Sequence, residues 1–139
     1  MTADIHDVVK RLEAARSRLS QLPYNEILLS FLDHLESLGL SRARVLKYAT
    51  SLCTIYRHVP FDPANASKRD IERIVAWVNR QPYREWTKHG LKIAVRKLVQ
   101  YAKYGSCDGK TPMPPEVAWI KITVRDKDSG VTPEIKCIF

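Results

Sequence analysis

A chain of 139 residues, 45% of them hydrophobic, is long enough for one domain whose core buries roughly two thirds of the unfolded surface. Its formal net charge of +8 favours a polyanionic partner such as nucleic acid. No stretch approaches the roughly 20 apolar residues that span a bilayer, and the N-terminus lacks a signal-peptide pattern. The three cysteines follow neither disulfide nor metal-ligand spacing. We therefore expect a cytoplasmic protein with no membrane partner.

Apolar residues recur at spacings of three and four through the first 58 residues, which predicts three helices. Pro23 ends the first, an amphipathic helix over residues 4–22. Asn25 can cap the second, and Gly39 suits its C-terminal end. Ser41 can cap the third. The inward positions of this third helix are Val45, Ala49, Leu52, Cys53 and Tyr56.

Two further helices follow an extended, proline-containing connection. Ser67 opens the fourth, and Asp70 completes an imperfect capping box in which Asp replaces the usual Glu or Gln. Pro82 separates it from a long helix over residues 84–104, which Gly105 ends.

Glycines and prolines punctuate the rest of the chain, where strand-like alternation is confined to a weak stretch at residues 119–124. The predicted fold class is therefore all-α: a compact bundle of four to five helices, with an N-terminal amphipathic helix and an irregular C-terminal tail. The predicted divisions are residues 1–22, the helical domain at 23–105, and a linker or tail at 106–139.

The long helix carries a basic residue at every fourth position: Arg84, Lys88, Lys92 and Arg96. Residues four apart share a helix face, and like charges there repel by a few tenths of a kcal/mol per pair. We therefore expect this basic stripe to bind an anion; the alternative is an ordinary solvated face. The opposite, buried side is predicted to hold Trp86, Gly90, Ala94, Leu98, Tyr101 and Ala102.

Positive charge is concentrated in two of the predicted helices. Residues 41–58 hold four bases and no acid, and residues 84–103 hold six bases against Glu85. Residues 23–40, by contrast, hold three acids and no base. This asymmetry predicts a directed nucleic-acid surface whose affinity falls steeply with salt. Candidate contacts are Arg42, Arg44, Lys47, Tyr48, Lys68, Arg84, Thr87, Lys88, Lys92 and Arg96.

Those candidates divide by chemistry. Lysines and Arg96 suit phosphates, whereas Arg42, Arg44 and Thr87 suit base edges in a groove. For Tyr48, core packing beside Leu52 competes with a nucleic-acid contact. Catalytic patterns are missing, since the chain has neither a glycine-rich phosphate loop nor a nucleophile elbow. We expect no catalytic residues, metal, cofactor or small-molecule ligand.

The order of these features resembles a known family. An acidic, apolar helix ends in Gly39, a basic helix follows with Tyr48 seven residues after its opening serine, and a short Ser-capped helix carries Trp77. The long helix ends in Tyr-Ala-Lys-Tyr-Gly at 101–105, and prolines mark residues 112–115. Residues 24–120 thus resemble the N-terminal core-binding (SAM-like) domain of tyrosine recombinases, the phage-integrase family. The family's usual Asn-Pro exit is absent.

This resemblance implies a helical half-clamp on double-stranded DNA, with helices 41–58 and 84–104 toward the duplex. The family's catalytic set, an Arg, a Lys, a His-x-x-Arg and a tyrosine nucleophile, belongs to a separate C-terminal domain and has no counterpart in this sequence. We therefore expect a nucleoid-associated fragment of a recombinase acting in DNA integration and recombination, and no enzyme activity from this chain alone.

Two alternatives stay open from the sequence. The first is a small helical protein-interaction module that binds through the helix at 4–22 and whose basic face is incidental. The same helix could also contact other recombinase subunits. The second and weaker alternative is RNA binding, which usually exposes stacking aromatics on a sheet that this chain does not offer.

Overall fold

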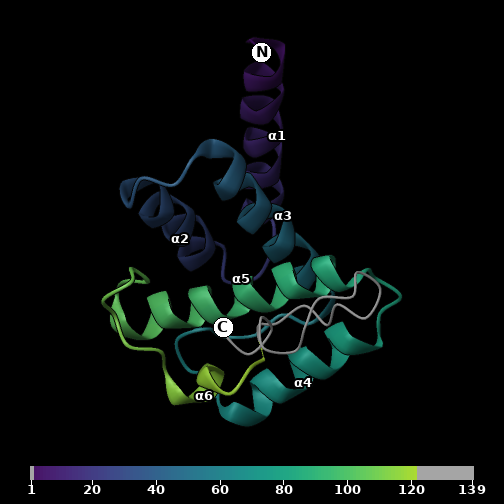
Figure 1. Ribbon diagram of the computed structural model, residues 1–139, viewed down its shortest axis with the longest axis vertical. Coiled ribbons are helices and arrows are strands. Elements are labelled where there is room, and N and C mark those ends of the chain that lie inside the picture. The colour runs from purple at the N-terminus through teal and green to yellow at the C-terminus, as the bar shows by residue number, and fades with distance from the viewer. Residues whose placement is uncertain (1, 122–139) are drawn as a thin grey trace, which may run out of the picture.

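The computed structural model describes residues 2–121, with side chains from residue 7 onward. All regular secondary structure in this part is helical, which confirms the all-α prediction (Figure 1). The predicted strand is not formed at residues 119–121, and its remaining residues lie outside the described part of the chain. The helices are α1 Thr2–Ser20, α2 Asn25–Ser37, α3 Arg42–His58, α4 Lys68–Arg80, α5 Glu85–Tyr104 and α6 Pro115–Ala118.

Helix α5 is the central element. It crosses the middle of the molecule, with α2 and α3 packed on one side and α4 and α6 on the other (Figure 1). Its buried face repeats at spacings of three and four: Leu91, Ala94, Val95, Leu98 and Val99. The prediction that Trp86 lies on the buried side is wrong, because its side chain is 71% exposed. At 100° per residue, Trp86 points about 150° away from the centre of the buried face.

Several helix ends follow the predicted local chemistry. The Ser41 hydroxyl accepts a hydrogen bond from the Arg44 amide at 3.3 Å, which caps α3. After α2, Gly39 adopts a φ of 91°, and the Leu40 amide donates back to the Leu35 carbonyl at 3.3 Å. This pair of features is a Schellman end, in which glycine avoids the strain of the left-handed region.

The predicted capping role of Asn25 is wrong. Tyr24, with a φ of 61°, precedes the first turn of α2 and makes no side-chain cap. The Asn25 amide group instead donates to the Ser20 carbonyl at 2.8 Å, at the end of α1. Asn25 therefore satisfies a carbonyl that the end of α1 leaves without a partner.

The second half of α1 belongs to the same core as the other helices. Leu12, Ala15 and Leu19 are buried where α1 packs against α2 and α3. Cys53, predicted as a small core residue, is buried there, with its thiol 3.8 Å from the Ala15 carbonyl. The N-terminal half of α1 rises away from the body of the molecule (Figure 1).

Residues 106–121 are irregular apart from α6, as predicted, but they pack onto the bundle. The buried Gln100 amide donates to the carbonyls of Thr111 and Pro112, at 2.8 and 3.1 Å. The Cys107 amide donates to the His34 imidazole at 3.1 Å. These contacts attach the segment to α5 and α2, so that the compact unit extends beyond the predicted boundary at residue 105.

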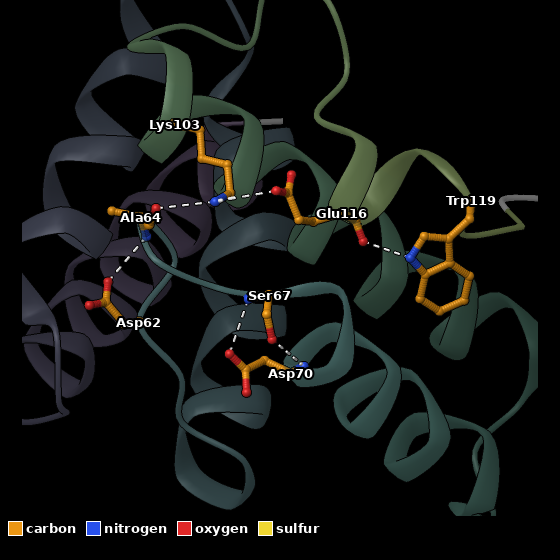
Figure 2. A network of polar contacts seen from close by, with 7 residues as sticks. All are labelled: Asp62, Ala64, Ser67, Asp70, Lys103, Glu116 and Trp119. Carbon is orange, nitrogen blue, oxygen red and sulfur yellow. Dashed lines mark hydrogen bonds and ion pairs between the residues drawn. The ribbon is translucent and has the colours of Figure 1, made fainter.

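Polar contacts fix the C-terminal end of α5 to the loop before α4 and to α6 (Figure 2). The Lys103 ammonium donates to the Ala64 carbonyl at 3.2 Å and lies 3.9 Å from the Glu116 carboxylate of α6. The predicted capping box beside it is complete: the Asp70 amide donates to the Ser67 hydroxyl, and the Ser67 amide donates to the Asp70 carboxylate.

We expect Ser67→Ala to lower the free energy of unfolding by about 1 kcal/mol, because it leaves the Asp70 amide without its capping partner. Urea unfolding followed by circular dichroism measures this loss. Ser17→Ala is the matched control, since Ser17 is exposed within α1 and alanine favours a helix interior. Equal stability of the two variants would contradict the capping role.

Candidate nucleic-acid interface

The N-terminal halves of α3 and α5 enclose a groove with a volume of about 570 Å³. Four of the predicted contact residues meet here: Arg44, Lys47 and Tyr48 from α3, and Thr87 from α5. The remaining lining residues are Thr50, Ser51, Trp86, His89, Gly90 and Ile93. The structure thus brings together residues that lie about 40 positions apart in the sequence.

Tyr48 unites the two roles weighed for it from the sequence. Its ring packs edge-on against buried Phe31, with ring centroids 6.0 Å apart, and also lines the groove. Burial raises the pKa of its phenol, while Arg44 acts in the opposite direction. The hydroxyl is therefore protonated at neutral pH and can donate a hydrogen bond.

Cationic side chains lie on the α3 side of the groove. Arg44 and Lys47 are both exposed, and among the described residues neither forms an ion pair. Across the groove, burial lowers the pKa of His89, and the positive charges of Lys92 and Lys47 lower it further. His89 is therefore neutral at pH 7 in a positive environment.

Six of the ten lining residues were not among the predicted contacts, and two of these, Trp86 and Gly90, were wrongly predicted to lie on the buried side of α5. The Trp86 ring is exposed and stands edge-on to His89, with centroids 5.4 Å apart. Gly90 lies one helical turn later on the same side. A signal for both existed in the sequence, because the spacing of Leu91, Val95 and Val99 defines a buried face that excludes them.

The basic stripe does not form one exposed row. Arg84 is exposed, but the Lys88 side chain is 15% exposed, and its ammonium donates to the Asn79 carbonyl at 2.9 Å. Lys92 and Arg96 are half-buried, and burial is the main cause that lowers the pKa of each. Each four-residue step overshoots a full turn by about 40°, so the stripe winds around the helix.

The other two predicted contacts lie apart from the groove lining. Arg42 is exposed in the first turn of α3, where helix amides are available to an anion. Lys68 is exposed at the start of α4 and follows the loop in which the Ala64 carbonyl accepts a hydrogen bond from Lys103, at the C-terminal end of α5. That end lies about 20 Å along α5 from the groove, at a rise of 1.5 Å per residue.

Aromatic packing positions the N-terminal end of α5. Trp77 of α4 stacks on His58 of α3 at 5.0 Å between ring centroids and meets Tyr83 edge-on at 6.4 Å. The Gln81 side chain donates to the Trp77 carbonyl at 3.0 Å. Together with the bond from Lys88, these contacts fix the turn before α5, and so the place of Trp86.

Comparison with known proteins gives no relative: no family model, no curated protein and no solved structure matches the chain. Within residues 2–121, no helix has the length and apolar character needed to cross a membrane. The same part of the chain holds no cluster of three or more His, Cys, Asp or Glu side chains suited to a metal ion.

We expect Gly90→Ala to raise the free energy of unfolding by about 0.5–1 kcal/mol, since alanine favours a helix interior and the added methyl meets no atom within 4 Å. Gly39→Ala is the control and should destabilise the fold, because a φ of 91° strains any residue with a Cβ. Urea unfolding of both variants tests this; a destabilised Gly90→Ala chain would show that the groove floor is tightly packed.

Proposed function

We propose that this chain binds double-stranded DNA through the α3–α5 groove, as the core-binding half-clamp of a site-specific tyrosine recombinase. The observation that carries the proposal is the convergence of Arg44, Lys47 and Thr87 on one groove. Two exposed cations on one side of a groove attract phosphates, and neighbouring hydroxyls supply hydrogen bonds to the backbone or to base edges.

The start of α3 extends this surface. Ser41 caps the helix, and Arg42 and Arg44 flank its N-terminal amides. Helix N-termini favour anions because their amide groups and the helix dipole both point toward them. A phosphate held there would lie along the same helix as Lys47.

The resemblance to recombinases supports the finer part of the proposal. By this resemblance, the two helices that face DNA in the recombinase core-binding domain correspond to α3 and α5, the helices that enclose the groove. In this role the chain positions DNA for recombination and integration, and a separate domain cleaves it. The protein-interaction alternative has less support, because the apolar residues Leu12, Ala15 and Leu19 of α1 are used inside the chain.

We expect the double variant Arg44→Ala, Lys47→Ala to weaken binding to every duplex alike, because the proposal places phosphates, and not base edges, against both cations. The slope of log affinity against log salt should fall by about one per residue removed. Fluorescence anisotropy with a labelled duplex of about 20 base pairs, between about 50 and 200 mM salt, measures both effects.

The matched control removes two exposed cations that are neither predicted contacts nor part of the groove lining, as Arg69→Ala, Lys110→Ala. An equal loss of affinity in this control would mean that net charge alone binds DNA, and an unchanged salt slope in the groove variant would remove Arg44 and Lys47 from the interface.

Duplex affinity should also rise as the pH falls from neutral toward the lowered pKa of His89 in the free chain. In the free chain, burial together with Lys92 and Lys47 lowers the pKa of His89. A bound phosphate favours the imidazolium form, so binding takes up a proton between the free and bound pKa values. Anisotropy titrations of wild type and His89→Gln isolate this effect, and parallel pH profiles would contradict it.

A further inference from the structure

Gly90 has no structural reason to be glycine. It lies inside α5, where glycine disfavours the helix relative to alanine, and its φ is not positive. A Cβ built there meets no atom within 4 Å, so no neighbouring part of the chain requires the space. Because glycine has no side chain, the backbone of α5 at Gly90 lines the groove directly.

The surroundings of this bare backbone have a definite chemistry. Trp86 lies one turn earlier and leaves its ring 71% exposed, while Ile93 and Tyr48 contribute apolar surface to the same groove. The cations Arg44 and Lys47 stand on the α3 side only. The groove therefore suits a ligand that is flat and apolar on its faces and negatively charged along one edge.

We propose that the groove receives one unpaired nucleobase of the bound DNA, which lies over Gly90 and stacks on Trp86 while its flanking phosphates meet Arg44 and Lys47. This inference rests on the proposed DNA binding and specifies what the groove takes from the DNA. A base inside a duplex has both faces covered by its neighbours, whereas an unpaired base can leave the stack and offer a face to an aromatic ring.

The polar groups around the groove support a base over other flat ligands. Thr87, Ser51 and the neutral His89 can donate and accept hydrogen bonds at the edge of a base. An acidic amphipathic peptide would also pair with Arg44 and Lys47. Such a peptide, however, does not need the space that Gly90 leaves for a flat group beside the exposed Trp86 ring.

Three DNAs test the inference with the whole chain: a paired duplex, the same duplex with a one-nucleotide bulge, and that bulge carrying an abasic site. The abasic bulge has the same added flexibility and phosphate but no base to stack. We expect wild type to bind the base-containing bulge about 10-fold more tightly than the abasic one. Fluorescence anisotropy gives the ratio.

Variants connect that ratio to the groove. Trp86→Ala and Gly90→Ala should each bring it to about one, the first by removing the ring and the second by placing a methyl where the base lies. Trp86→Phe should keep part of the preference, since it retains an aromatic face. Trp119→Ala is the matched control, because Trp119 is also exposed but lies beside Glu116 of α6, and it should keep the full preference (Figure 2).

The outcomes separate this inference from the proposed function. Salt-dependent duplex binding with no preference for the base-containing bulge would overturn the inference alone. A preference that survives in both Trp86→Ala and Gly90→Ala would overturn it too. No binding to any of the three DNAs would overturn both, and capture of a Glu-rich helical peptide in its place would assign the groove to a protein partner.

Discussion

The burial of one face of α5 between two groups of helices is the constraint on which the rest of the structure depends. Leu91, Val95 and Leu98 form the centre of that face and join α2 and α3 to α4 and α6. Lysines fix the helix near both ends, with Lys88 donating to the Asn79 carbonyl and Lys103 to the Ala64 carbonyl. Their apolar stems cover the helix while the ammonium groups satisfy carbonyls that helix and loop ends leave open. These contacts set the rotation of α5, and thereby which residues face the groove.

That rotation decides what the sequence could and could not predict. The ends marked by Gly39, Ser41 and Ser67 depend on chemistry within a few residues, and the sequence located them correctly. The rotation of α5 about its own axis depends on which side of it the neighbouring helices cover. A spacing of four residues suggested one basic face, but the drift of about 40° per step spreads the basic residues around the helix, and Lys92 and Arg96 are half-buried. The same misjudged rotation placed Trp86 in the core.

The groove itself lay beyond local prediction, because it exists only where α3 and α5 approach each other. Arg44, Lys47 and Thr87 were identified as candidates by charge and hydroxyl chemistry, yet nothing in the sequence shows that they share one surface. The packing of residues 106–121 was missed for a similar reason. Its glycines and prolines predict irregular backbone, as found, but the buried Gln100 amide that holds the carbonyls of Thr111 and Pro112 is a tertiary contact.

The structure also divides the positive charge into two classes, which changes the meaning of the net charge. Lys88 and Lys103 give their ammonium groups to backbone carbonyls, and Arg16 pairs with Asp33 at 2.9 Å, so these cations stabilise the fold. Arg44 and Lys47 form no such pairs among the described residues and border an apolar groove. The surface offered to a polyanion is therefore smaller than the composition suggests. If the groove binds DNA as proposed, its shape and apolar floor contribute to the affinity together with its charge.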